Sequence, residues 1–495
     1  MCPSLPRAAE ALGPLSFSWV DDHLLLSNDA GRWALLPRDD GRALLQGRLP
    51  ADHPRRGELA AKGFLRAHLD IEDLAARTAR KRSALARGTH LHIVVVTLRC
   101  DHACRYCLAS RAPMGAHEHD MDVDTARRVV DLVFQSRSPA LTLEFQGGEP
   151  LANPEVVRFI VEYARQLNRS HGKELSFSLV SNLSLMASSY LDWLVAPDIA
   201  LCTSIDGPAD LHDHHRLLAG GDSSFARAVG WIHRFREAYA ERGYDPGLFR
   251  VEALMTTTRA SLSRADDIVD AYVELGLPAL YLRPLNPYGF AAAAWNRIGY
   301  EVNEYLDFYF TALDAVLRRN REGVDLREHT ASVYLSKLLT PDDPGHLDLR
   351  SPCGAGIGQL AYAPDGRVYT CDEGRMLGRT GDDTFALGTV VSERWRDLVG
   401  HPTVRTMLVA STLESLPECR ECAFRPFCGV CPVHTWAEQR DLFGQRRLST
   451  RCELQRGQLT GILRRLRDDA DGSTERFFRR WTVNRQRADA PACAT

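Results

Sequence analysis

From residue 90 onwards, short apolar runs alternate with longer segments whose apolar positions recur every three or four residues. Short apolar runs are typical of buried strands, and the three-to-four spacing is typical of helices with one buried face. The expected strands are 92–98, 141–145, 175–180, 199–205, 250–255 and 280–285, and the expected helices are 124–135, 154–167, 188–195, 225–239 and 261–275. Apolar strands that alternate with helices form parallel sheets covered on both faces. Six such units predict an α/β fold, a partial (βα)6 barrel.

The first 88 residues follow another pattern. A strand at 17–26, a turn at 28–31 and a returning strand at 32–36 predict a hairpin, and short helices are expected after Pro37 and at 55–62. A small hairpin with short helices resembles the winged-helix elements with which peptide-modifying enzymes bind a leader peptide along a sheet edge. The alternative is an extension that only stabilises the rest of the chain.

Length and charge limit the class of protein. The chain has 495 residues, more than one domain usually holds, and a net charge of −3 argues against a nucleic-acid or anionic-membrane partner. The N-terminal sequence MCPSLPRAAEALG lacks the apolar core of a signal peptide, and the apolar runs are too short for a membrane span. We therefore expect a soluble, cytoplasmic protein. Its expected domains are 1–88, a barrel at 89–330, a cysteine-rich domain at 331–455 and a C-terminal helix and tail at 456–495.

Cysteine usage points to metal binding. The chain has thirteen cysteines and no export signal, so metal sites are favoured over disulfides. The stretch TLRCDHACRYC places Cys100, Cys104 and Cys107 at spacing Cys-x3-Cys-x2-Cys. Three thiolates on one loop hold a cubane iron–sulfur cluster and leave one iron open, whereas a structural zinc site needs four ligands. A zinc knuckle is the alternative.

This loop resembles the cluster loop of radical S-adenosylmethionine (SAM) enzymes, and Tyr106 matches the aromatic residue usual before the third cysteine. Three more segments of this family type stand at the ends of expected strands, where sites in such barrels lie. They are Gly147-Gly148-Glu149-Pro150, Ser181-Asn182 and the stretch 204–208 that begins with Ser204. The resemblance implies that the first contacts the amino group of SAM, and that the others lie near its ribose and methionine.

Three further polar residues are candidates for the same site. Arg216, in the phrase LHDHHR, has the geometry to pair bidentately with the SAM carboxylate, the alternative being a surface salt bridge. Asp206 and His215 are candidates for handling a proton. Met255 and Arg283 are expected to line the cavity at the ends of strands five and six.

A second set of cysteines resembles the SPASM domain of radical SAM enzymes, which carries two auxiliary [4Fe–4S] clusters. Its members are Cys353, Cys371, Cys419, Cys422, Cys428, Cys431 and Cys452. The resemblance implies an outer cluster on Cys419, Cys422, Cys428 and Cys452, and an inner cluster on Cys353, Cys371 and Cys431. Cys428 and Cys431 are separated by two residues where the family has three. No further cysteine stands close to Cys353, so the inner cluster has an open iron or a ligand other than cysteine. Zinc bound by the two Cys-x2-Cys pairs is the alternative.

Together these motifs extend from 90 to 452 and resemble the peptide maturases of the family, in particular the His-Xaa-Ser system type. The segments FQGGEPLANPE, VSNLSL and SIDGPADLHDHHR carry that likeness. It implies an enzyme that cleaves SAM reductively to a 5′-deoxyadenosyl radical and crosslinks or cyclises a ribosomally made precursor peptide. An electron donor such as flavodoxin or ferredoxin would be its other partner. The rival hypotheses are a sulfatase-maturase activity that makes formylglycine, and a non-catalytic zinc or iron–sulfur protein that only docks a peptide.

Overall fold

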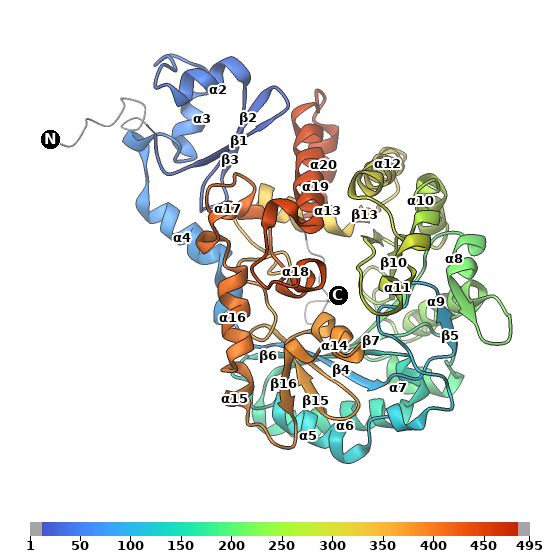
Figure 1. The fold of residues 1–495 in the computed structure, drawn as a ribbon. Coiled ribbons are helices and arrows are strands. Elements are labelled where there is room, and N and C mark those ends of the chain that lie inside the picture. Colours follow the sequence, from blue (N-terminus) through green and yellow to red (C-terminus); the bar gives the residue numbers. More distant parts are fainter. Residues whose placement is uncertain (1–11, 484–495) are drawn as a thin grey trace.

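The computed structural model describes residues 12–483. Its largest sheet has nine strands (Figure 1). The strand order is β12-β10-β8-β7-β6-β4-β14-β15-β16. The first six of these strands are parallel neighbours. In chain order they are β4 (Leu91–Thr97), β6 (Ala140–Gly147), β7 (Glu174–Val180), β8 (Ile199–Ser204), β10 (Val251–Thr256) and β12 (Leu282–Arg283). The predicted α/β fold with six parallel strands is confirmed.

Helices follow these strands as the periodicity predicts. They are α5 (Val123–Val133), α6 (Pro154–His171), α7 (Leu191–Leu194), α9 (Ser224–Glu241), α10 (Ala265–Glu274) and α12 (Val302–Arg321). In α6 the buried side chains include Val157, Ile160 and Ala164, which lie three or four residues apart. Burial of each larger one stabilises the fold by about 1.5–3 kcal/mol. Pro154 begins this helix, and Gly172 ends it in the left-handed conformation that glycine adopts most easily.

The sixth expected strand is divided in two. Its first part, β11 (Ala279–Leu280), pairs with β13 (Arg327–Glu328), and only its second part, β12, joins the main sheet. Two short strands outside the main sheet, β5 (His102–Cys104) and β9 (Arg216–Leu218), pair with each other and were not predicted. Their pairing matters for the site described below.

The cysteine-rich region extends the barrel sheet. Its strand β14 (Gln359–Tyr362) pairs in parallel with β4, and β15 (Arg367–Tyr369) and β16 (Ala386–Thr389) continue the sheet as antiparallel strands. The expected domain boundary at residue 331 therefore does not separate two sheets, because the barrel and the cysteine-rich region share one. Cys353 lies shortly before β14 and Cys371 shortly after β15, so these added strands help to position both thiols.

The N-terminal region is a separate small sheet with helices, seen in blue at the top of Figure 1. Its elements are β1 (Ser16–Val20), β2 (His23–Ser27), β3 (Trp33–Pro37), α2 (Arg38–Leu45), α3 (Arg56–Ala61) and α4 (Ile71–Lys81). The single strand expected at 17–26 is wrong, because Asp21 adopts a left-handed φ of 55° and turns the chain back on itself. The result is a three-stranded antiparallel sheet instead of a hairpin.

Further helices complete the chain: α8 (Ala209–His215), α11 (Gly289–Ile298), α13 (His329–Leu339), α14 (Asp372–Arg379), α15 (Trp395–Val399), α16 (Pro402–Ser411), α17 (Pro417–Arg420), α18 (Pro432–Gln439), α19 (Thr450–Arg467) and α20 (Ser473–Trp481). Helix α19 runs across the expected boundary between 455 and 456. The C-terminal segment, expected as one helix and a tail, also includes α20, which packs on α12, α13 and α19 and buries Phe478 and Trp481. Within residues 12–483, no helix has the length and apolarity to cross a membrane. Cys2 and Cys493 lie outside the described residues.

Candidate functional site

The cysteine loop and the Gly-Gly-Glu segment are joined by backbone hydrogen bonds at the end of β4. Gly148 N donates to Thr97 O over 3.0 Å, and Glu149 N donates to Arg99 O over 2.7 Å. A Cβ atom on Gly148 would overlap the carbonyl oxygens of Leu98 and Arg99. Only glycine lets the two segments approach this closely, so the carboxylate-bearing segment is held next to Cys100.

Arg99 anchors the start of the loop, a role that sequence reasoning missed. Its guanidinium donates two hydrogen bonds of 2.7 Å to the two carboxylate oxygens of Asp120. Such bidentate pairs restrain geometry more strongly than single contacts do. The position directly before Cys100, combined with a buried guanidinium, is the signal that could have identified it.

Glu149 organises the end of the neighbouring strand. Its carboxylate accepts hydrogen bonds from Ser181 Oγ at 2.7 Å, Asn182 N at 2.7 Å and Leu151 N at 3.0 Å. Burial raises the pKa of Glu149 to about 7, although these donors lower it. The predicted segments after β6 and β7 are therefore in direct contact.

Asn182 connects this network to the cysteine loop. Its side-chain amide donates to Asp101 Oδ1 at 3.0 Å and lies 2.6 Å from His102 Nδ1 and 3.8 Å from Cys100 Sγ. Sequence reasoning placed Asn182 near SAM but did not foresee this contact with the loop. The amide thus helps to orient the first of the three thiols.

The pairing of β5 with β9 brings the middle of the loop to Arg216. Cys104 and Arg216 are register partners, and Arg105 N donates to His215 O over 3.0 Å. Arg216 Nε donates to Tyr106 OH at 2.7 Å and to Asp206 Oδ2 at 3.1 Å. Tyr106 OH also donates to Asp206 Oδ2. Arg216 is therefore buried beside the loop and does not form a surface salt bridge.

Asp206 is fully buried, and both of its oxygens are engaged. Oδ2 accepts from Tyr106 and Arg216, and Oδ1 accepts from Thr256 N at 3.2 Å. Burial acts to raise the pKa of Asp206, but the charges of Arg216 and His212 outweigh it and lower this pKa. A carboxylate held ionised in this way is better suited to fixing Arg216 than to exchanging protons.

His215 and Ser204 lie at the same edge of the barrel. His215 Nε2 is 2.8 Å from Thr258 Oγ1, and the imidazole ring lies 5.9 Å from the ring of Tyr106. Burial lowers the pKa of His215 to about 4, so the imidazole is neutral at pH 7. Ser204 is buried at the end of β8, and Pro150 begins a short 3-10 turn.

The three loop thiols form a donor set suited to a metal cluster. Burial raises the pKa of Cys104 to about 12, with Arg216 lowering it and the charge of Cys107 raising it. Burial also raises the pKa of Cys100, and the charges of Glu149 and Cys104 add to this. Because their thiolate forms repel one another, a cationic centre between them, such as an iron–sulfur cluster, would stabilise the ionised thiols.

The other seven cysteines divide into two groups. Cys353, Cys371 and Cys431 lie in one buried cluster with Tyr288. After burial, the charges of Cys422, Cys452 and Cys419 are the main influences that raise the pKa of Cys428. This grouping agrees with the inner and outer sets that the resemblance implies.

The spacing of these thiols differs from that of a closed zinc site. Zinc–sulfur bonds of about 2.3 Å place tetrahedral sulfurs about 3.8 Å apart. Within residues 12–483, the only metal-like group whose ligand atoms all lie within 4.8 Å of one another is Cys100 with Asp101 and His102. The inner and outer sets are therefore spread more widely than a single zinc ion requires.

A cavity of about 670 Å³ lies between the barrel and the cysteine-rich region. This volume is in the range of small-molecule and peptide side-chain sites. From the barrel, Gln146, Cys202 and Arg283 face it, and the inner thiols line its other side. Cys202 is buried in β8. Met255 is a fully buried core residue and does not line this cavity, contrary to expectation, because it points to the helix side of β10.

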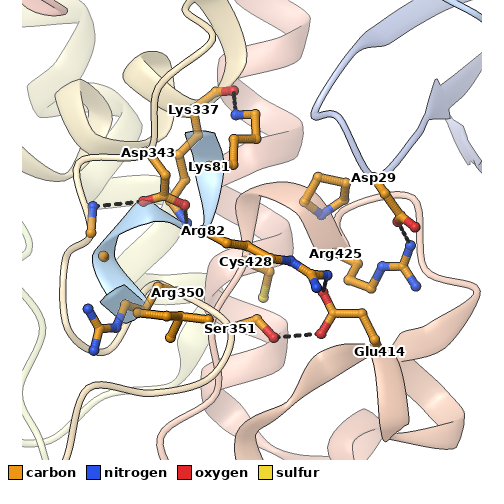
Figure 2. A pocket seen from close by; sticks show the side chains of 14 residues that line it. Asp29, Lys81, Arg82, Lys337, Asp343, Arg350, Ser351, Glu414, Arg425 and Cys428 are labelled. Atoms are coloured by element: carbon orange, nitrogen blue, oxygen red, sulfur yellow. Dashed lines mark hydrogen bonds and ion pairs between the residues drawn. The ribbon is translucent and has the colours of Figure 1, made fainter. Parts of the chain in front are cut away.

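A second, smaller pocket lies beside the outer set. Figure 2 shows Cys428 among charged side chains that come from α4, α13 and the loops near Ser351 and Glu414. Arg82 contacts Glu414 at 2.8 Å, Lys337 contacts Asp343 at 3.0 Å, and Arg425 pairs with Asp29. The lining includes five cationic residues, Lys81, Arg82, Lys337, Arg350 and Arg425, and three acidic ones, Asp29, Asp343 and Glu414.

Residues 94–245 match the family profile described as Radical SAM superfamily. The matched range begins in β4 and includes the three loop cysteines, Glu149 and Arg216. The chain therefore contains a radical SAM domain, built around the geometry described above.

Similar proteins extend the likeness beyond this domain. The radical SAM cyclopropyl synthase TigE of Paramaledivibacter caminithermalis is 21% identical over 333 residues, which cover 63% of this chain and 65% of TigE. The structure of anSMEcpe with bound AdoMet and Cp18Cys peptide has a TM-score of 0.62 at 19% identity, covering 77% of this chain and 99% of that one. Streptococcus suis SuiB bound to precursor peptide SuiA has a TM-score of 0.52 at 12% identity, with coverage of 89% and 99%. The structural likenesses show a shared fold.

Glu144 gives a prediction about pH. Burial raises the pKa of this β6 carboxyl from 4.5 to about 7. Because the folded state holds the proton more tightly than the unfolded state, stability is lost as the pH rises from 4.5 to about 7. Glu144→Gln should therefore raise the free energy of unfolding at pH 8 by about 3 kcal/mol and change it far less at pH 5.

Urea denaturation of the metal-free protein at both pH values measures this effect. Glu162→Gln, on the exposed face of α6, controls for the loss of a glutamate charge. An equal effect of Glu144→Gln at pH 5 and pH 8 would contradict the assignment.

Proposed function

We propose that this protein is a radical SAM enzyme that modifies a ribosomally made precursor peptide by crosslinking or cyclising it. The observation that carries the proposal is the contact of Glu149, Asn182 and Arg216 with one loop that presents three thiols. The segments FQGGEPLANPE, VSNLSL and SIDGPADLHDHHR further support the His-Xaa-Ser system type of maturase.

The residues of the loop and strand ends have separate tasks. Cys100, Cys104 and Cys107 would hold a [4Fe–4S] cluster, which supplies the electron that cleaves SAM to methionine and a 5′-deoxyadenosyl radical. Glu149 attracts the amino group of SAM, and Arg216 attracts its carboxylate. Asp206 and Tyr106 keep Arg216 oriented, so we assign Asp206 a positioning role. His215 remains the candidate for proton transfer.

The rest of the chain would serve the peptide. The barrel cavity excludes water from the reacting carbon, which protects a radical from side reactions. The inner and outer thiol sets would bind two auxiliary [4Fe–4S] clusters. The N-terminal sheet would bind the leader of the precursor along a strand edge.

The test uses anaerobically reconstituted protein with SAM, dithionite and a short precursor peptide encoded beside the gene. We expect 5′-deoxyadenosine and a peptide product whose mass is lower by two hydrogens per crosslink. Formation of formylglycine on a sulfatase peptide would instead support the rival maturase activity. Bound zinc without SAM cleavage would instead support the hypothesis of a non-catalytic protein that only docks a peptide.

We also propose that the electron donor approaches the outer set at the pocket of Figure 2. Cys428 lines this pocket, and its cations outnumber its anions. An acidic flavodoxin or ferredoxin would be attracted to such a surface. The half-exposed Arg82 lies at its edge.

Charge reversal at Arg82 tests the docking site. Arg82→Glu should lower the ratio of flavodoxin-supported to dithionite-supported SAM cleavage about tenfold at low salt, and added salt should reduce the difference. Arg158→Glu, which reverses a more exposed charge on α6, serves as the control. An equal loss of SAM cleavage with flavodoxin and with dithionite would show that Arg82→Glu damages the enzyme itself and does not act on the binding of the electron donor.

A further inference from the structure

The inner thiol set lacks a fourth cysteine. A cubane cluster has four iron corners, and Cys353, Cys371 and Cys431 account for three of them. Cys202 also faces the cavity, but its thiol is directed to Thr203 O at 3.7 Å within β8. A ligand of another type is therefore required for a closed inner cluster.

Glu373 stands beside all three inner thiols. Cys371 caps the N-terminus of α14, which places Glu373 in the first turn of that helix. Glu373 and the three thiols line the same cavity. The negative charge of Glu373 also acts on each thiol, raising the pKa of Cys353, Cys371 and Cys431 after the larger effect of burial.

The other carboxylates near this set are already engaged. Asp348 pairs with Arg451 and lies 2.9 Å from His346 Nδ1. Asp372 accepts a hydrogen bond of 2.7 Å from Arg375 Nε. The half-buried Glu373 side chain, by contrast, has no hydrogen bond or ion pair to another residue in the range 12–483, and the opposite charge that acts on it is that of Arg283. A carboxylate that lines one cavity with three thiols and is not engaged by a donor is available as an oxygen ligand for a metal ion.

We propose that a carboxylate oxygen of Glu373 is the fourth ligand of the inner auxiliary cluster. This inference rests on the proposed function, since it requires that the inner set binds iron. It also deepens that function, because a cluster with four protein ligands has no iron free to bind the peptide. The inner cluster would then exchange electrons and would leave peptide binding to the cavity walls.

The experiment isolates the auxiliary clusters. In a variant with Cys100, Cys104 and Cys107 all changed to alanine, reconstitution should leave about eight irons. The electron paramagnetic resonance spectrum of this reduced protein is recorded with and without excess 2-mercaptoethanol, and its reduction potentials are titrated. Added thiol should leave the spectrum unchanged, because no iron is open.

Glu373→Ala in the same background should make the spectrum respond to the added thiol and shift one potential upwards, since an anionic ligand is lost. Glu373→Gln, which keeps the side-chain volume, should shift that potential in the same direction. Glu373→Cys should restore a spectrum that does not change when 2-mercaptoethanol is added. Glu252 also lines the cavity, but it accepts a hydrogen bond of 2.9 Å from Arg250 Nε. Glu252→Gln should therefore give the same spectrum and the same potentials as the parent protein.

Two results would overturn the assignment in different ways. If the parent already responds to thiol as strongly as Glu373→Ala, the inner iron is open and Glu373 is not its ligand. If only about four irons bind, and Cys353→Ala does not lower that count further, the inner cluster itself is absent and that part of the proposed function fails. The iron count separates the two failures.

Discussion

Cys104→Ala should abolish 5′-deoxyadenosine formation and reduce bound iron from about twelve to about eight atoms per chain. Cys104 lies on β5 opposite Arg216, the group proposed to bind the SAM carboxylate. With only two thiols left, the loop cannot bind a [4Fe–4S] cluster stably. The measurements are iron and sulfide analysis and chromatography of the products after anaerobic incubation with SAM and dithionite.

Cys202→Ala is the matched control for the iron count. Cys202 is a buried thiol of β8 that belongs to none of the three sets, so its removal should leave about twelve irons. If Cys104→Ala retained the full iron count and cleaved SAM, the loop would not be the catalytic cluster site. Zinc in both proteins would favour the docking hypothesis.

Asp206→Ala should lower the free energy of unfolding by about 3–5 kcal/mol, because it leaves the buried Arg216 guanidinium without its partner. It should also weaken SAM binding, since Arg216 loses the contact that orients it. The pKa of Asp206 is lower in the folded protein than its usual value. The stabilisation is therefore complete above the unfolded pKa of about 3.9 and is lost only as the pH falls below it.

Denaturation of the metal-free protein at pH 7 measures the stability effect, and calorimetric titration of the reconstituted protein with SAM measures the binding. Asp198→Ala is the matched control, because Asp198 pairs with Arg165 at a partly exposed site. That pair is expected to contribute about 1 kcal/mol or less. Equal losses in the two variants would show that the Asp206 pair has no special importance.

The elements of the barrel were predictable because their signal is local. The seven residues of β4 are all buried, and the sequence indicates this by the apolar, β-branched run at 93–96. Helix α6 has its apolar residues three or four positions apart, as any helix with one buried face does. The strand at 17–26 failed because the polar pair Asp21 and Asp22 forms a turn between two strands, whereas the prediction included both residues in one strand.

The contacts of the site were only partly predictable. The residues at the strand ends were identified, but their partners were not. The pairs Asp206–Arg216 and Arg99–Asp120 depend on how separate segments approach one another. The addition of β14 to the edge of β4 likewise joins segments far apart in sequence. No local pattern of apolar and polar residues contains that information.

The sequence by itself determined the six strand–helix units and the three-thiol loop, because residue spacing decides which groups can meet within one turn or loop; the division of the other cysteines was implied only by the resemblance to the SPASM domain. Only the tertiary structure decided which charged groups pair, that the cysteine-rich region continues the barrel sheet, and that Glu373 lines one cavity with the inner thiols. Those outcomes depend on the packing of distant segments, where burial sets the strength of every charge–charge contact.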